Sequence, residues 1–220
     1  MCKIKLIIFD CDGVLIDSEI ISNRIHAQVR TEMGFPMSTK EHIRAFSGHG
    51  INSEFMRKSF EILPGNFLSV VRDRSKEAYL TELKAVSGVR EALAKISLPK
   101  CIASNSDPEK LKMMLKVTGL SNFFVGTVFS SHMVKVGKPA PDLYFYVAEK
   151  MKFTPMECLV IEDSAVGVRA ARAAGMKVFG FVGGGHVYPE LTGILEEEGV
   201  ELVFSNMREL PTLISDFESI

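Results

Sequence analysis

Cysteine is scarce in this chain, long apolar runs are missing, and neither sign of charge dominates. The four cysteines among 220 residues include no C-x-x-C pair and no nearby histidine at zinc-ligand spacing, so a structural zinc site is not expected. No apolar run approaches the roughly 20 residues of a membrane span. The net charge of −1 indicates neither a nucleic-acid surface nor a membrane-binding face.

What remains is the composition of an ordinary globular protein. Hydrophobic residues make up 46% of the chain and charged residues 24%, and 220 residues suffice for one large domain or for a domain with a smaller insert. Residues 1–3 lead directly into an apolar strand and an aspartate, which is unlike a signal peptide. We therefore expect a cytoplasmic protein with no nucleic-acid and no membrane partner.

Strand and helix patterns alternate from about residue 100 onward. Short apolar runs predict strands at 100–103, 125–129, 158–161, 177–182 and 201–204, after a first strand within residues 4–9. Capping signals such as Asp107-Pro108 begin the helical patterns between them. This alternation predicts an α/β fold with a parallel sheet that is covered by helices on both faces.

Residues 17–83 break this alternation, because they contain four helical patterns and no strand pattern. The apolar stripe of the first helix ends at Gly34, and a capping box at 38–41 opens the second. We interpret 17–83 as a helical domain that is inserted into an α/β domain made of residues 1–16 and 84–220.

The first strand ends in two carboxylates. Asp10 and Asp12 follow residues 4–9 directly, and Gly13 comes next. Ionised carboxylates are costly to bury unless they are paired or bind a metal. By itself, an Asp-x-Asp-Gly sequence is equally typical of a turn, so the other strand ends must decide between a site and a turn.

Polar residues follow three further predicted strands. They are Ser104-Asn105-Ser106 after 100–103, Gly137-Lys138-Pro139 after 125–129, and Glu162-Asp163-Ser164 after 158–161. Each fragment alone is typical of a loop, a helix cap or a solvated charge. In an open parallel sheet, however, ligands bind at the carboxyl ends of the strands. The joint appearance of these fragments therefore predicts one site at one edge of the sheet.

The chemistry that these side chains suit is phosphoryl transfer. An aspartate such as Asp10 can form an aspartyl phosphate, and Asp12 would then serve as general acid and base. Asp10 and Asp163, with the backbone carbonyl of Asp12, would offer Mg²⁺ hard oxygen ligands. Lys138 and the Ser104 hydroxyl would hold the phosphoryl oxygens.

In order and spacing, these fragments resemble the four motifs of the haloacid dehalogenase-like superfamily. The matching residues are Asp10-x-Asp12-Gly13-Val14-Leu15, Ser104-Asn105, Gly137-Lys138-Pro139 and Glu162-Asp163-Ser164-x-x-Gly167. The resemblance covers essentially the whole chain and implies a Rossmann-like core with a helical cap of the C1 type. It also implies a Mg²⁺-dependent phosphatase, able to work as a monomer, that acts on a small phosphomonoester such as a sugar or sugar-acid phosphate. The implied roles are nucleophile for Asp10, acid and base for Asp12, phosphate binding for Ser104, Asn105 and Lys138, and metal binding for Asp10, Asp12, Glu162 and Asp163.

A phosphomutase of the same superfamily is an alternative. A mutase must exclude water and hold a second phosphate on its cap, and β-phosphoglucomutase does so partly with an arginine in a cap loop. Here the comparable loop at 46–50 carries His49 beside Gly48, which favours the phosphatase and makes these two residues candidates for substrate specificity. A catalytically silent phosphate sensor is a more remote alternative, because no motif residue is missing.

Three other potentially reactive side chains receive no functional role. Cys11 lies between two carboxylates, which disfavour its thiolate. His132 and His186 fall in predicted loops. His186 follows three glycines, and we expect it at the surface.

Overall fold

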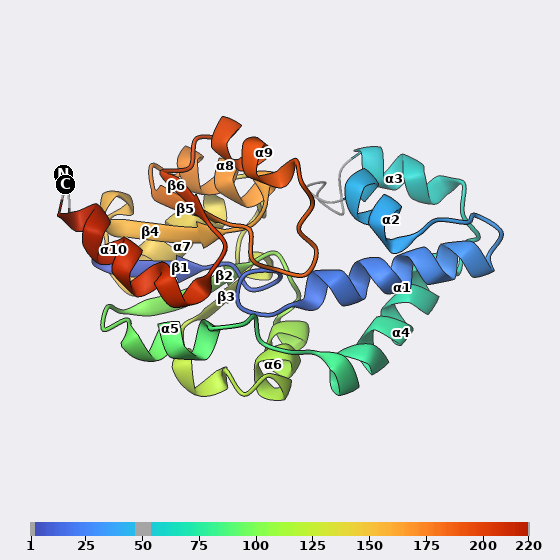
Figure 1. Ribbon diagram of the computed structural model, residues 1–220, viewed down its shortest axis with the longest axis horizontal. Coiled ribbons are helices and arrows are strands. Elements are labelled where there is room, and N and C mark those ends of the chain that lie inside the picture. Colours follow the sequence, from blue (N-terminus) through green and yellow to red (C-terminus); the bar gives the residue numbers. More distant parts are fainter. Residues whose placement is uncertain (1–2, 47–53, 220) are drawn as a thin grey trace.

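The computed structural model describes residues 3–46 and 54–219. Its centre is a parallel sheet in the strand order β3-β2-β1-β4-β5-β6 (Figure 1). The strands are β1 (Leu6–Phe9), β2 (Lys100–Ser104), β3 (Val128–Ser130), β4 (Cys158–Glu162), β5 (Lys177–Phe181) and β6 (Leu202–Phe204). The order reverses direction at β1, which is the point where open α/β sheets bind ligands. The predicted α/β class with a Rossmann-like sheet is confirmed.

Strand β1 is buried on both faces, as its unbroken apolar sequence predicts. Leu6 and Ile8 belong to the hydrophobic core on one side of the sheet, whereas Ile7 and Phe9 belong to the core on the other. All four side chains are fully buried. Successive side chains of a strand point to opposite faces, so these four residues join both cores.

The register of the central strands brings their ends to one level. Phe9 lies opposite Ile102 of β2 and Ile161 of β4. The next residue, Asp10, donates its backbone N–H to the carbonyl of Ile161 at 3.0 Å. The polar residues that follow each strand therefore emerge side by side at one edge of the sheet.

Helices cover both faces of the sheet (Figure 1). On the face that holds Ile7 and Phe9 lie α5 (Val89–Lys95), α6 (Pro108–Val117) and α10 (Leu210–Glu218). On the opposite face lie α7 (Asp142–Met151), α8 (Ala165–Ala173) and α9 (Leu191–Glu197).

Four further helices form a separate group beyond the end of β1 (Figure 1). They are α1 (Ser18–Glu32), α2 (Thr39–Phe46), α3 (Glu54–Glu61) and α4 (Phe67–Glu82). The chain enters and leaves this group side by side, because Asp17 N donates to Lys84 O at 3.0 Å and Val86 N donates to Leu15 O at 3.0 Å. The helical group thus sits on a two-segment stem at the strand ends. Within the described part of the chain, none of the helices combines the length and apolar character needed to cross a bilayer.

The predicted capping signals are confirmed. The Ser38 backbone N–H donates to the Glu41 carboxylate at 2.7 Å, and Glu41 N donates to the Ser38 hydroxyl at 3.2 Å, which is the reciprocal pattern of a capping box. The side chain of Asp107 accepts hydrogen bonds from the backbone of Glu109 and Lys110 at the start of α6. These local signals act over three residues, so the sequence alone reveals them.

Other boundaries differ from the prediction. The strand predicted at 125–129 begins late, because Val125 is 80% exposed and Gly126 has a φ of +74°, a turn conformation that favours glycine. Helix α5 was not predicted, since seven residues are too few for a clear periodicity. A separate 3₁₀ turn at Met207–Glu209 directly precedes α10.

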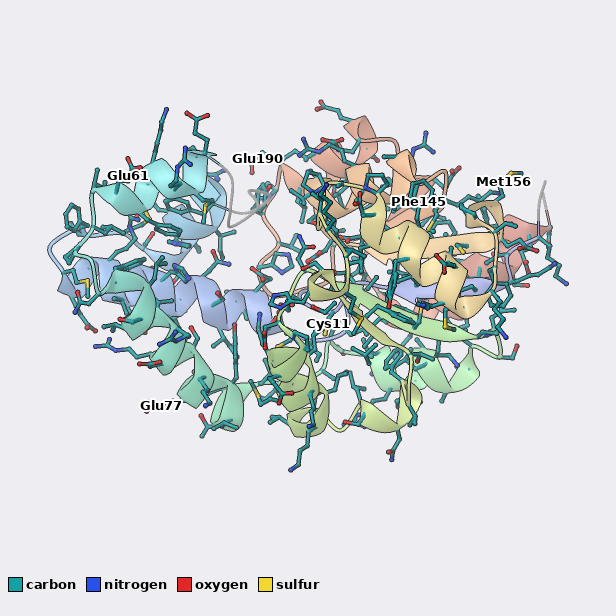
Figure 2. All side chains as sticks on the ribbon, turned by 180° about the vertical axis from the view of Figure 1, so that it is seen from behind. Cys11, Glu61, Glu77, Phe145, Met156 and Glu190 are labelled. Carbon is teal, nitrogen blue, oxygen red and sulfur yellow. The ribbon has the colours of Figure 1, made fainter. Side chains whose placement is uncertain are left out.

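Replacing Phe9 by alanine should destabilise the protein strongly. Phe9 is fully buried and meets Phe124 edge-on, with ring centroids 6.2 Å apart. The cavity left behind should lower the free energy of unfolding by about 3–5 kcal/mol. Phe145 on α7 is 47% exposed (Figure 2), and Phe145→Ala should change it by no more than about 0.5 kcal/mol. Urea denaturation measures both variants, and equal losses would contradict the placement of β1 in the core.

Candidate active site

One cavity of about 630 Å³ lies where the strand ends meet the helical group. The strand ends contribute Asp10, Asp12, Ser104, Asn105, Lys138, Glu162 and Asp163, and the helical group contributes Ser22, Asn23, His26, His42 and Phe46. Every site residue predicted at a strand end therefore lines the same cavity. Gly48 and His49, predicted for substrate specificity, lie outside the described residues.

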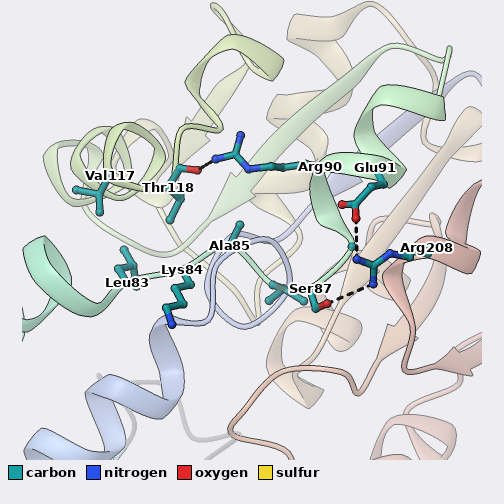
Figure 3. A pocket seen from close by; sticks show the side chains of 11 residues that line it. Leu83, Lys84, Ala85, Ser87, Arg90, Glu91, Val117, Thr118 and Arg208 are labelled. Atoms are coloured by element: carbon teal, nitrogen blue, oxygen red, sulfur yellow. Dashed lines mark hydrogen bonds and ion pairs between the residues drawn. The ribbon is translucent and has the colours of Figure 1, made fainter.

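A smaller pocket of about 410 Å³ lies near the end of α6 and the segment after α4 (Figure 3). Its two arginines are engaged with protein groups: Arg90 donates to the carbonyl of Thr118, and Arg208 pairs with Glu91 at 2.6 Å. None of the predicted site residues lines this pocket. We therefore place the chemistry in the larger cavity.

Lys138 lies at the centre of the larger cavity's polar floor. Its ammonium nitrogen lies 2.6 Å from Asp10 Oδ1, 2.6 Å from Glu162 Oε1 and 2.8 Å from the carbonyl of Ala103. An ammonium group has three N–H donors, so all of them are used. Burial lowers the pKa of Lys138, but the two carboxylates outweigh it and the pKa lies well above its usual value. The lysine therefore stays charged.

Asn105 fixes the backbone of Lys138. Its Nδ2 donates to the carbonyl of Lys138 at 3.0 Å, and its Oδ1 accepts the backbone N–H of Lys138 at 3.0 Å. A glycine is required next to this contact, because a Cβ on Gly137 would lie 2.7 Å from Asn105 Oδ1. The side chain of Asn105 is thus occupied in positioning the lysine.

Asp12 is held by a different set of donors. Its Oδ1 accepts from the Ser18 hydroxyl at 2.6 Å and from Lys110 Nζ at 2.9 Å, and its Oδ2 accepts from the Ser106 hydroxyl at 2.7 Å. Burial alone raises the pKa of Asp12, but Lys110 and the two hydroxyls outweigh it and lower the pKa. Sequence reasoning missed Lys110, because it lies in the first turn of α6 and outside every motif.

Asp10 lies in a more crowded electrostatic environment. Burial raises its pKa well above the usual range, Lys138 opposes this, and the neighbouring Glu162 and Asp163 add to it. Crowded hard oxygen donors of this kind fit Mg²⁺, which binds through one or two carboxylates together with water and phosphate oxygens. In residues 3–46 and 54–219, no three Asp, Glu, His or Cys side chains converge to enclose an ion. The fit therefore rests on two side chains, those of Asp10 and Asp163, with the backbone carbonyl of Asp12.

Glu162 is fully engaged within the protein. Its Oε1 accepts from Lys138 and from the Tyr144 hydroxyl at 3.0 Å, and its Oε2 accepts from the Ser164 hydroxyl at 3.1 Å. Helix α8 starts directly over this carboxylate, and a Cβ on Gly167 would lie 1.8 Å from Glu162 Oε1. The Ser-x-x-Gly spacing of the sequence is therefore explained by the space that Glu162 needs.

The structure overturns the expectation that His186 lies at the surface. It is only 5% exposed, and its Nε2 lies 3.0 Å from Asp163 Oδ2. Burial lowers the pKa of His186, but the hydrogen bond and charge of Asp163 raise it to about 9. The pKa of Asp163 is raised, chiefly by burial, although the hydrogen bond and the charge of His186 lower it. Sequence reasoning missed this contact because it joins the loop after β5 to the end of β4.

The remaining side chains considered in the sequence lie away from this chemistry. Cys11 is fully buried beside the loop that leads to α1 (Figure 2), and burial, followed by the charge of Asp12, raises the pKa of its thiol well above the usual value. A protonated, inaccessible thiol is no nucleophile. His132 is exposed, 3.8 Å from the carboxylate of Asp107.

A comparison with known families agrees with this geometry. A family model described as haloacid dehalogenase-like hydrolase matches residues 7–181. The chain belongs to the haloacid dehalogenase-like hydrolase family. The match includes every predicted site residue of the strand ends.

Relatives of this haloacid dehalogenase-like hydrolase include phosphatases. The 6-phosphogluconate phosphatase of Escherichia coli is 27% identical over 221 residues, covering 97% of this chain and 96% of the relative. The phosphorylated carbohydrates phosphatase of Thermotoga maritima is 32% identical over 209 residues, covering 90% and 94%. A crystal structure of a haloacid dehalogenase-like protein of unknown function from Agrobacterium tumefaciens has a TM-score of 0.90 and 36% identity, covering 97% of this chain and 99% of that chain. The predicted class, a phosphoric monoester hydrolase, is confirmed.

The His186–Asp163 pair should make the stability of this hydrolase depend on pH. The pKa of His186 is raised from 6.5 to about 9 in the folded protein, so its stabilisation is complete below about pH 6.5 and is lost as the pH rises through about 9. Without metal, in EDTA, we expect the free energy of unfolding to fall by up to about 3 kcal/mol across this range. Chemical denaturation at a series of pH values measures the loss, and the slope should be much smaller for His186→Gln. An equal slope in both proteins would contradict the pairing.

Proposed function

We propose that this chain is a Mg²⁺-dependent phosphatase that hydrolyses a sugar or sugar-acid phosphate through an aspartyl-phosphate intermediate. The observation that carries the proposal is the separate engagement of two neighbouring carboxylates. Asp10 is paired with Lys138 and Asp12 with Lys110. Carboxylates in different environments can take different roles in one reaction. The names of two relatives, which refer to 6-phosphogluconate and to phosphorylated carbohydrates, support a sugar-type substrate.

Asp10 is the nucleophile of the first step. Lys138 holds its Oδ1 at 2.6 Å, which leaves Oδ2 to attack the phosphorus atom of the substrate. The new bond joins Oδ2 to phosphorus while the bond from phosphorus to the ester oxygen breaks. The leaving oxygen takes a proton from Asp12. This carboxylate is ionised without substrate and takes up a proton from solvent when the phosphate dianion lies beside it.

Asp12 serves as the base of the second step. It accepts a proton from the water that attacks phosphorus, the bond between phosphorus and Asp10 breaks, and phosphate leaves. The same carboxylate must therefore keep its position through both steps. The hydrogen bonds from Ser18, Ser106 and Lys110 fix this position.

Positive charge must offset the repulsion between phosphate and the carboxylates. The ammonium group of Lys138, whose three N–H donors are bonded within the protein, would supply positive charge beside the phosphoryl group, and the Ser104 hydroxyl would bind a phosphoryl oxygen. Asp10, Asp163 and the backbone carbonyl of Asp12 would hold Mg²⁺, which supplies charge neutralisation when bound. The side chain of Asn105 is bonded to the backbone of Lys138, and Glu162 accepts a hydrogen bond from its ammonium group. We therefore assign both residues to positioning that lysine.

We further propose that residues 17–83 form a cap domain that covers the substrate. On the cap side, the cavity is lined by Asn23, Phe46 and two histidines. Burial lowers the pKa of His26 to about 4 and that of His42 to about 3, so both are neutral at physiological pH. Neutral hydrogen-bonding groups beside an aromatic ring suit the hydroxyls and carbon skeleton of a sugar.

Other expectations stay predictions. These are the specificity roles of Gly48 and His49, the monomeric state, the cytoplasmic location and the absence of nucleic-acid and membrane partners.

Phosphate release from a panel of substrates tests the proposed activity. We expect Mg²⁺-dependent turnover that is fastest with phosphorylated sugars, sugar acids or alditols, and slower with phosphoglycolate and nucleotides. Release from none of them, together with isomerisation of glucose 1-phosphate in the presence of a bisphosphate primer, would show a mutase instead. Absence of both phosphate release and isomerisation would favour a phosphate-binding sensor.

Asp10→Asn should lower phosphate release at least about a thousandfold, because an amide oxygen is a poor nucleophile. Asp73→Asn is the matched control, since Asp73 is 71% exposed on α4 and should leave turnover unchanged. Steady-state kinetics on the best substrate of the panel measures both variants. Substantial activity in Asp10→Asn would contradict the role of Asp10 as nucleophile.

A further inference from the structure

His186 is a buried side chain that the proposed mechanism does not use, yet it contacts a proposed metal ligand. Its Nε2 lies 3.0 Å from Asp163 Oδ2, and both side chains are only 6% exposed. His186 comes from the loop that joins β5 to α9, whereas Asp163 follows β4. The loop carries none of the motif residues described above.

The contact encloses one of the two carboxylate oxygens. Gly13 has a φ of +81°, and a Cβ at that position would lie 1.8 Å from Asp163 Oδ2. Asp163 Oδ2 therefore lies between the Cα of Gly13 and the ring of His186. Among the described residues, the hydrogen bond from His186 to Oδ2 is the only one found at the Asp163 carboxylate, so Oδ1 is the oxygen left for a further ligand.

The loop is built to bring His186 to this position. A Cβ on Gly184 would lie 2.8 Å from His186 Nδ1 and 2.9 Å from the carbonyl of Gly13, so only glycine allows the approach. The next residue, Gly185, donates its backbone N–H to Asp17 Oδ1 at 2.9 Å. This bond fastens the loop to the segment that leads from the strand ends into α1.

We propose that His186 is a positioning residue for the metal site: it donates Nε2–H to Asp163 Oδ2 and thereby presents Oδ1 to the divalent cation. The inference rests on the proposed function, because it assumes that Asp163 binds Mg²⁺ there. Hydrogen bonds that orient metal-binding carboxylates strengthen binding because the ligand does not have to be ordered when the ion arrives. Because Gly13 and His186 enclose Oδ2, the cation would bind Oδ1, and the histidine does not compete with it for an oxygen atom.

Binding of Mg²⁺ to the full-length protein tests this role without an activity measurement. Isothermal titration calorimetry should show a Kd for Mg²⁺ that is about 10–100-fold weaker in His186→Ala than in the wild type. His186→Gln keeps an N–H donor at nearly the same reach and should recover most of the affinity. His132→Ala, which removes an exposed histidine, is the control and should bind like the wild type.

Unfolding midpoints of all variants in EDTA separate this role from a structural one. A lower midpoint in His186→Ala with unchanged Mg²⁺ affinity in both His186 variants would overturn the inference, and so would tighter binding in His186→Ala. A wild type that binds no Mg²⁺ would overturn it as well. If the wild type binds Mg²⁺ in a His186-dependent way but releases no phosphate from any ester, the proposed function fails while the positioning role stands.

Discussion

The site depends on one buried positive charge, the ammonium group of Lys138. It lies 2.6 Å from both Asp10 and Glu162, and without it these carboxylates would be buried with no compensating charge, which is strongly unfavourable. Each partner anchors another part of the fold: Asp10 follows β1, and Glu162 ends β4 beneath the start of α8. Asn105, in the loop after β2, fastens this loop to Lys138, because its side chain bonds both the N–H and the carbonyl of the lysine backbone. Lys138 therefore connects three strand ends, with Asp10 and Glu162 bound by its side chain and the loop after β2 bound to its backbone.

The parallel sheet creates this concentration of charge and also limits it. Because β1, β2 and β4 end at one level, the polar residues that follow them lie close together. Each aspartate forms an ion pair with a different residue: Asp10 with Lys138, Asp12 with Lys110 and Asp163 with His186. Four carboxylates still outnumber these cationic groups. The remaining negative charge costs stability in the free protein and is what makes the edge suited to a divalent cation.

The helical group is connected to Asp12, the proposed acid and base, as well as to the larger cavity. Ser18, the first residue of α1, donates to Asp12 at 2.6 Å. From α4, the ring of Tyr79 lies 5.6 Å from the ammonium group of Lys110, which itself pairs with Asp12. A movement of α1 or α4 would therefore alter the surroundings of Asp12 directly. This coupling gives a physical route by which closure over a substrate would act on the proposed proton transfer.

The sequence by itself determined the elements and the chemical type of the site. The apolar run before Asp10, the alternation after residue 100 and the polar residues at strand ends are local patterns, and in a parallel sheet they imply a common edge. The sequence did not predict short or irregular segments such as α5 and the turn at Gly126, because their sequence patterns are too brief or depend on backbone conformation. Only the tertiary structure decided the partners: Lys110 with Asp12, Asn105 with the backbone of Lys138, and His186 with Asp163. These contacts join residues from different strand ends, and their geometry depends on the packing of whole elements, which no pattern along the chain records.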